Sequence, residues 1–331
     1  MRRASTGAAA VAGDAGPMRA AGAASGGAVS GAARGPLPPP RLLVAAGELP
    51  AWATRYAFVE HGYRDPARHA SPSECLRSVF LRVSNETLNV HTHLWPGLTA
   101  LGCLAWAAQL PAFAEASAAG RLAVALSCAA TFVMGLASAA AHTFHVMSDA
   151  ARATAWRLDY VGILCPLFAQ QWCTSWFVAL ALAGGGGVGG GPGVVFLALQ
   201  AAAVVVALYC ALEIVVRERY GAINISFVWS NVPHVVVLQL LAARAGAPPP
   251  LVRAAALALL TSALIALSGL LYNAHVPERL FASAAARRVF SFVGNSHQLM
   301  HVFTAAACYA NTFAALEIAG YEATLRGAAA A

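Results

Sequence analysis

The 331-residue sequence contains no lysine, and its charged residues of both signs together amount to only 11%. An average soluble domain has about 25% charged residues, so this composition cannot supply a water-facing surface. With 59% hydrophobic residues, the chain is predicted to be an integral membrane protein. The formal net charge of +7 excludes an acidic solvating chain. We expect no nucleic-acid partner, because the cytoplasmic loops of a membrane protein accommodate the excess arginine.

Closely spaced cysteine pairs are missing as well. The seven cysteines form no CxxC motif, and six of them fall inside apolar stretches. A disulfide or thiolate–metal framework is the alternative, but this placement favours cysteine as a small apolar packing residue.

The region before the first long apolar segment divides into two parts. Residues 1–40 consist almost wholly of Ala, Gly, Ser, Pro and Arg, which predicts a disordered N-terminal region. An organelle transit peptide is the alternative, because this region contains arginine and is poor in acidic residues. Residues 41–87 have mixed polarity and are predicted to be a cytosolic juxtamembrane segment. Within it, residues 55–64 are expected to lie against the membrane surface as a short amphipathic stretch.

Residues 88–320 are predicted to form an all-α transmembrane domain of seven helices, with a short tail at 321–331. Crossing roughly 30 Å of hydrocarbon takes about 20 apolar residues in helical conformation. Segments of that length are separated by a glycine-rich loop, a proline-rich turn and a Pro-Glu-Arg helix stop. The predicted helices cover residues 88–113, 122–145, 158–181, 194–216, 223–241, 254–272 and 296–319.

The distribution of arginine predicts the orientation of this bundle. If the N-terminus is cytosolic, 17 arginines fall on the inner segments and 4 on the outer ones. Without the long N-terminal region the split is still 7 against 4. The positive-inside rule therefore favours an N-in, C-out topology, which is the reverse of a G-protein-coupled receptor.

Five residues whose side chains could take part in catalysis or metal binding lie at one predicted depth in the membrane. Ser138 and His142 end the second helix, Asp159 begins the third, and His297 and His301 begin the last. In the N-in orientation all five lie at the cytoplasmic end. His297 and His301 are four residues apart and so share one helix face. With His142 they make a three-imidazole set that leaves a position for water, as in catalytic zinc sites.

Each of these residues also has a simpler explanation. His297 and His301 can hydrogen-bond backbone or lipid head groups, and imidazoles also suit Fe, Ni or Cu, although zinc is favoured. Asp159 either orients or deprotonates a metal-bound water, or pairs with a neighbouring arginine. Ser138 either contacts that water or a reaction oxyanion, or packs as a small residue.

Three further histidines are weaker candidates. His145 follows His142 closely and is either a replacement ligand or a solvated side chain at the membrane interface. His91 and His93 lie at the start of the first predicted helix and at the same depth. They are candidates for contacting the metal ligands without binding the metal themselves.

Five motifs occur in a fixed order over about residues 50–320. They are residues 85–93, Ser138 with His142, residues 158–163, residues 277–279 and residues 294–301. In type and order they resemble the progestin and adipoQ receptor family, which includes the adiponectin receptors and the haemolysin III-like proteins. The resemblance implies seven helices, N-in topology and a zinc ion held near the cytosolic face by His142, His297 and His301. It also implies that Asp159 acts through water, that Ser138 belongs to a hydrolase signature, and that a cavity opens to lipid.

The resemblance also suggests a function. It implies a zinc-dependent hydrolase acting on a lipid amide, with a ceramide-like substrate, and an extracellular or steroid-type ligand as a further partner. The alternative is a non-catalytic signalling receptor in which zinc only ties helices together. Either protein would reside in the lipid bilayer of the plasma membrane or of an endomembrane such as the Golgi or endoplasmic reticulum.

Overall fold

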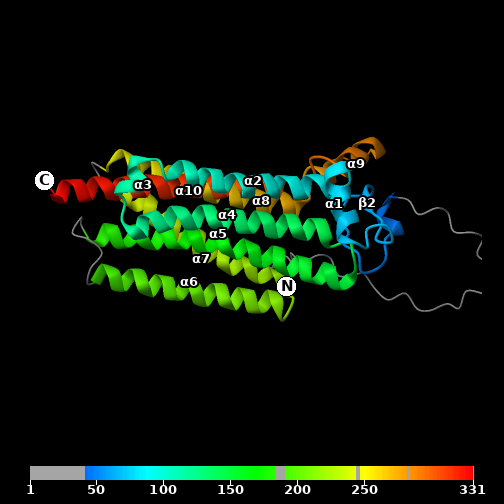
Figure 1. The fold of residues 1–331 in the computed structure, drawn as a ribbon, viewed down its shortest axis with the longest axis horizontal. Helices are drawn as coiled ribbons and strands as arrows, with labels where there is room; N and C mark the ends of the chain where they lie inside the picture. Colours follow the sequence, from blue (N-terminus) through cyan, green and yellow to red (C-terminus); the bar gives the residue numbers. More distant parts are fainter. Residues whose placement is uncertain (1–41, 184–190, 244–246, 282, 331) are drawn as a thin grey trace, which may run out of the picture.

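The computed structural model describes residues 42–183, 191–243, 247–281 and 283–330 (Figure 1). The predicted disordered region, residues 1–40, lies outside the described residues. Within these described residues, seven long helices run side by side (Figure 1), and each corresponds to one predicted apolar segment. They are α2 (Thr87–Ala107), α4 (Ala118–Phe144), α5 (Asp149–Ala183), α6 (Gly191–Val215), α7 (Ile223–Ala242), α8 (Pro249–Ala274) and α10 (Ser296–Ala330).

Short elements lie between the long helices and at the two ends of the bundle. The short helices are α1 (Pro72–Leu81), α3 (Pro111–Glu115), α9 (Ala284–Phe290) and the 3₁₀ turns η1 (Ala46–Glu48), η2 (Tyr220–Ala222) and η3 (Glu278–Leu280). Two strands, β1 (Leu43–Val44) and β2 (Tyr63–Arg64), pair antiparallel with Leu43 opposite Arg64. We call residues 42–81 the N-terminal cap, because they fold over one end of the bundle (Figure 1).

Six helical stretches within the described residues are long and apolar enough to cross a membrane. This agrees with the prediction of an all-α, multi-pass integral membrane protein. Helix α2 is not among the six, since Asn89, His91, Thr92 and His93 place polar groups in its first turns. The six stretches are Ala118–Phe144, Asp149–Leu180, Gly191–Val215, Tyr220–Ala242, Pro249–Leu280 and Ser296–Gly327.

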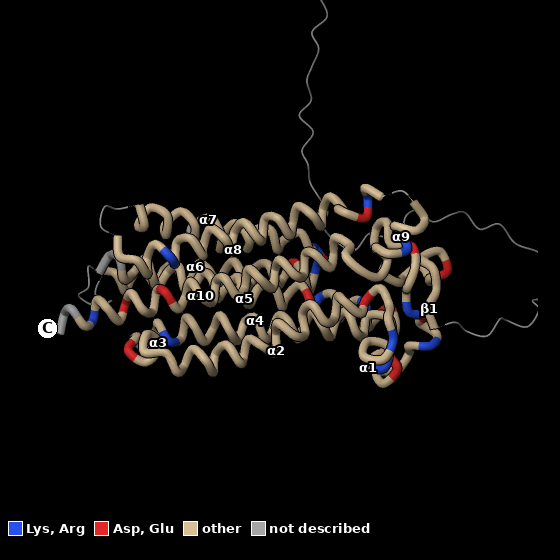
Figure 2. Tube along the Cα trace, turned by 90° about the horizontal axis from the view of Figure 1, so that it is seen from above, with Lys and Arg blue, Asp and Glu red and all other residues tan. Residues whose placement is uncertain are grey.

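The long helices differ in how much of their surface is buried. The apolar stretches of α4, α5 and α10 are mostly buried, whereas less than a third of those in α6, α7 and α8 is buried. Leu197, Leu208 and Leu270, for example, are each about two-thirds exposed. Charged residues gather towards the ends of the bundle and leave its middle apolar (Figure 2). The exposed apolar surfaces therefore suit a lipid environment, and α4, α5 and α10 supply the interior.

Helices α2 and α4 approach closely where two glycines face each other. A Cβ placed on Gly135 would lie 2.6 Å from the carbonyl oxygen of His93 and 2.8 Å from Gly97 Cα. Small residues at such a crossing let two helix backbones pack directly, as is common in membranes. This crossing sets the position of α2 beside the end of α4.

Two helix boundaries lie furthest from the predicted ones. Helix α5 begins at Asp149 rather than at residue 158, because the Ser148 hydroxyl accepts a hydrogen bond from Ala151 N and so caps a polar first turn. Helix α10 continues through the predicted tail to Ala330. There, Glu322 accepts a hydrogen bond from the backbone of Ser117, which ties the tail to the start of α4.

Residues 55–64 also differ from the expected surface-lying amphipathic stretch. They cross the ends of the helices, and Tyr63 and Arg64 are buried there. The Glu60 carboxylate accepts a hydrogen bond from Arg287 of α9 at 2.6 Å, which fastens the cap to α9. A buried arginine requires acceptors, and Arg64 finds them at the end of α4, as described below.

Candidate metal centre

Three buried histidines converge at the capped end of the bundle. His142 lies in the last turn of α4, and His297 and His301 lie in the first two turns of α10. One ring nitrogen from each lies within 4.8 Å of the others. The Nε2 atoms of His142 and His297 are 3.3 Å apart. Two imidazole nitrogens bound tetrahedrally to one zinc at 2.0–2.1 Å would be about 3.3 Å apart, so the spacing fits a shared divalent metal.

Hydrogen bonds at the opposite ring nitrogens orient two of these imidazoles. His142 Nδ1 lies 2.8 Å from Glu86 Oε2, and His301 Nδ1 lies 3.2 Å from the carbonyl oxygen of Asn89. Both partners are acceptors, so each Nδ1 carries the proton and each Nε2 keeps its lone pair. Neutral imidazoles with free Nε2 atoms are the form that binds a metal.

The start of α10 is fixed by polar side chains. The buried Glu278 of η3 accepts hydrogen bonds from the backbone N–H of Ser296, at 2.7 Å, and from its hydroxyl. Asn295 Oδ1 accepts a hydrogen bond from Gln298 N at 3.0 Å. A carboxylate and an Asn side chain at a helix N-terminus satisfy amide groups that have no partner within the helix. They fix the turn that carries His297.

Asp159 and Ser138 lie beside the cluster. Asp159 Oδ2 is 4.0 Å from His142 Nε2, and the residue is largely buried. Ser138 lies one turn before His142 on α4 and is also buried. It is close enough to Asp159 to interact with the carboxylate, but its hydroxyl has no hydrogen-bond partner of normal geometry among the described residues. The site thus has a carboxylate and a buried hydroxyl beside the three imidazoles.

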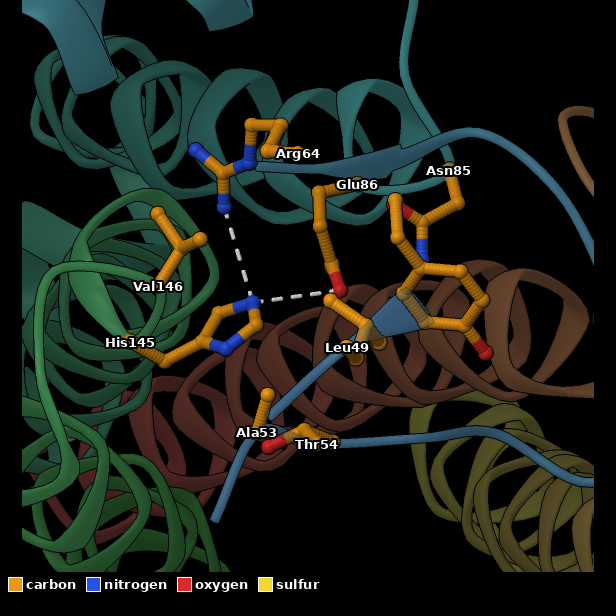
Figure 3. A pocket seen from close by; sticks show the side chains of 9 residues that line it. Leu49, Ala53, Thr54, Arg64, Asn85, Glu86, His145 and Val146 are labelled. Atoms are coloured by element: carbon orange, nitrogen blue, oxygen red, sulfur yellow. Dashed lines mark hydrogen bonds and ion pairs between the residues drawn. The ribbon is translucent and has the colours of Figure 1, made fainter. Parts of the chain in front are cut away.

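Glu86, the residue before α2, connects the cluster to the N-terminal cap. Its Oε1 lies 3.2 Å from His145 Nε2, which in turn lies 3.5 Å from an Arg64 nitrogen (Figure 3). Burial alone would raise the pKa of Glu86, but His145 and His142 outweigh it and hold that pKa well below its ordinary value. Glu86 is therefore a carboxylate that accepts hydrogen bonds from both imidazoles.

Arg64 caps the C-terminal end of α4 by hydrogen bonding to its last carbonyl groups. Its guanidinium donates hydrogen bonds to the carbonyl oxygens of His142 and Thr143, at 2.5 and 2.8 Å, and to the Ser78 hydroxyl at 3.2 Å. These carbonyls belong to the last turn, where no helical N–H is available to them. A cation there also interacts favourably with the helix dipole. The cap thus holds the turn of α4 that carries His142.

Aromatic rings enclose the histidines. The ring centroid of Tyr56 lies 4.9 Å from that of His297, and Trp156 lies 5.3 Å from His142. Burial is the main cause that raises the pKa of Tyr56 well above its ordinary value, and the nearby Glu86 carboxylate raises it further. The phenol is therefore neutral. Its buried hydroxyl has no hydrogen-bond partner of normal geometry among the described residues.

The other histidines take different positions. His93 packs against His301, with ring centroids 4.0 Å apart, and is a neighbour of the cluster. His91 instead lies against Val79 and Trp95, away from it. The interpretation of His145 as a solvated side chain is wrong, because it is buried and bonded to Glu86.

Sequence reasoning brought together the three histidines that converge in the structure but missed Glu86, Arg64 and Tyr56. One feature of the sequence could have pointed to Glu86. In a chain with only 11% charged residues, a carboxylate directly before an apolar helix is unusual. Nothing comparable marked Arg64 or Tyr56, since the cap has no periodic pattern.

A search of curated proteins finds no match. The family model described as haemolysin-III related matches residues 81–312, which is more than half of the chain. The matched region contains His142, Asp159, His297 and His301, together with the long helices that position them. This family includes the adiponectin and progestin receptors, in agreement with the resemblance of the sequence motifs. The chain therefore belongs to the haemolysin-III related family.

Proposed function

We propose that the protein is a zinc-dependent membrane hydrolase that cleaves the amide bond of a ceramide-like lipid. The observation that carries this proposal is the grouping of three buried imidazoles with the Asp159 carboxylate, 4.0 Å from the ligand nitrogen of His142. Three neutral His ligands leave coordination positions for water or substrate, which is typical of catalytic rather than structural zinc.

Bound at His142, His297 and His301, a divalent metal would polarise a substrate carbonyl and make water a better nucleophile at neutral pH. In amide hydrolysis, water adds to the carbonyl carbon, the C–N bond breaks and the leaving nitrogen gains a proton. In this proposal Asp159 accepts the proton of the attacking water and passes it to that nitrogen. In this proposal the buried Ser138 hydroxyl donates a hydrogen bond to the carbonyl oxygen as negative charge develops there. The reaction releases a fatty acid and an amine.

The membrane arrangement forms part of the proposal. We propose that α2 is a seventh span and that the N-terminus is cytosolic, which puts the histidines near the cytosolic face. A lipid amide is a suitable substrate for a site set among apolar helices that expose their outer surfaces to lipid. We also propose an extracellular or steroid-type ligand as a further partner, and the plasma membrane or an endomembrane as the location.

A signalling receptor with a structural metal is the second candidate. The observation that favours it is that the three ligands come from α4 and α10, so that a metal would cross-link two helices beneath the cap. Metal binding then contributes directly to folding stability. Both candidates predict a loss of stability when the metal is removed, whereas only the hydrolase predicts turnover.

The deciding experiment measures metal and activity on the same samples. Protein purified in detergent is analysed by elemental mass spectrometry and then assayed for ceramide hydrolysis, as wild type and as the double variant His297→Ala, His301→Ala. The matched control is His91→Ala, which removes an imidazole at the same end that points away from the cluster. We expect about one zinc per wild-type and control chain, and loss of both metal and turnover in the double variant.

The other outcomes separate the candidates. Zinc without turnover would favour the receptor, and folded wild type without metal would refute both. Ser138→Ala and Asp159→Asn are expected to retain zinc and lose turnover; full turnover in either would refute the role given to that residue.

A further inference from the structure

Glu86 stands out among the buried carboxylates because it is hydrogen-bonded to a candidate metal ligand, His142, at 2.8 Å. Its side chain is 2% exposed. It accepts hydrogen bonds from His142 Nδ1 at 2.8 Å, from Asn89 Nδ2 at 2.8 Å and from His145 Nε2 at 3.2 Å. Three donors on one buried carboxylate form a fully bonded group that is held in one place.

The bond to His142 decides which nitrogen of that imidazole is free. An ionised carboxylate can only accept, so the proton of a neutral His142 ring must lie on Nδ1. The lone pair then lies on Nε2, which faces His297 Nε2 at 3.3 Å. Glu86 thus determines both the tautomer of His142 and the direction in which its free nitrogen points.

A counter-charge makes this buried carboxylate tolerable. Arg64, also 2% exposed, lies on the other side of His145 and interacts electrostatically with Glu86. An isolated buried charge would cost several kcal/mol, and a nearby guanidinium offsets part of that cost. The cap therefore supports the carboxylate, and the carboxylate in turn supports His142.

We propose that Glu86 is the positioning residue of the metal centre and increases its affinity for divalent metal by fixing the His142 imidazole. This inference rests on the proposed function to the extent that the chain must bind a metal. Carboxylates that bond metal-ligating histidines in this way typically change metal affinity 10- to 100-fold when they are removed. Glu86 does not itself contribute a ligand atom to the three-histidine group.

The test is the zinc affinity of the full-length protein in detergent, measured by competition with a chromogenic chelator. Glu86→Gln keeps the shape of the side chain but removes its charge and places an amide N–H₂ among donors. The matched control is Glu213→Gln, because Glu213 is also a 2%-exposed carboxylate but bonds Arg217 and Arg219 at the end of α6. The melting temperature of the metal-free protein is recorded for each variant.

We expect Glu86→Gln to weaken zinc binding by roughly 10- to 100-fold, and Glu213→Gln to leave zinc affinity unchanged even where it lowers the melting temperature. The absorption spectrum of bound Co²⁺ should change in Glu86→Gln alone, since it reports ligand geometry. Equal zinc affinity in Glu86→Gln and wild type would overturn the positioning role and leave the proposed function intact. Folded wild type that binds no metal would overturn both.

A second variant covers failure of Glu86→Gln to fold. Asn89→Ala removes only the Nδ2 donor to the carboxylate oxygen that His142 also uses, and it retains the backbone carbonyl that holds His301. A several-fold loss of zinc affinity in Asn89→Ala would support the proposal. Unchanged affinity in that variant would contradict it.

Discussion

The crossing of α2 and α4 provides the sharpest test of the packing. In Gly135→Ala, the new Cβ would lie 2.6 Å from the His93 carbonyl oxygen, 2.8 Å from Gly97 Cα and 3.1 Å from Gly97 N. All three atoms belong to the backbone, so no side chain can move aside. The two helices would have to separate by several tenths of an ångström along the contact.

The expected cost follows from two opposing effects. Overpacking of a close contact costs roughly 1–3 kcal/mol, and a rigid backbone contact belongs in the upper part of that range. Replacement of glycine by alanine inside a helix returns about 1 kcal/mol. We therefore expect Gly135→Ala to destabilise the protein by about 1–2 kcal/mol. It should also weaken metal binding, because the displaced backbone of α2 carries the Asn89 carbonyl that holds His301.

The matched control is Gly102→Ala on α2, the helix that Gly135 of α4 contacts, because a new Cβ at Gly102 meets nothing within 4 Å. That variant should gain up to about 1 kcal/mol from helix propensity alone. The assay is the apparent melting temperature in detergent, with and without chelator. Melting temperatures that move in opposite directions would support the close contact. A Gly135→Ala variant at least as stable as Gly102→Ala would refute it.

Three further predictions concern the N-terminal cap. Gly62→Ala should destabilise the cap by about 1–3 kcal/mol, because Gly62 has φ +80° and a Cβ there would lie 2.6 Å from the Phe292 ring. Thermal unfolding measures this, with Gly47→Ala as the control because a Cβ at Gly47 has no atom within 4 Å. Cys75 should react slowly with maleimide at pH 8, because burial raises the pKa of its thiol and only the thiolate reacts. Peptide mapping by mass spectrometry measures the labelling rate. Fast labelling of the folded protein would contradict the burial of Cys75. Arg64→Ala should lower the free energy of unfolding by about 3 kcal/mol, because it leaves two buried carbonyl oxygens without a partner. It should also speed the labelling of Cys75. A labelling rate equal to that of the wild type would show that Arg64 does not hold the cap.

Spacing in the sequence was sufficient to find the three histidines. His297 and His301 are four residues apart on a long helix, so their proximity follows from helical geometry. The meeting of His142 with them follows once alternate helices are antiparallel, because the end of one helix and the start of another then share a depth. Polar residues in apolar helices are few, and this scarcity left little choice among the candidates.

The contacts of Glu86 and Arg64 could not be obtained in this way. Glu86 lies 56 residues before His142, and Arg64 bonds a carbonyl 78 residues away. Both contacts depend on how irregular segments fold over the helix ends, and such segments have no repeating pattern to read. The early start of α5 was different, since Ser148 and Asp149 are recognisable capping residues that counting apolar residues overlooked.

The position of Arg64 and Tyr56 has a practical consequence for work on homologues. Both residues precede residue 81, where the family match begins, yet they border the histidine cluster. A truncated or chimeric protein that keeps only the matched region would retain the three histidines of the cluster and lose the guanidinium and phenol beside them. Exchange of N-terminal segments between relatives is thus a way to alter the surroundings of the cluster without touching a single ligand.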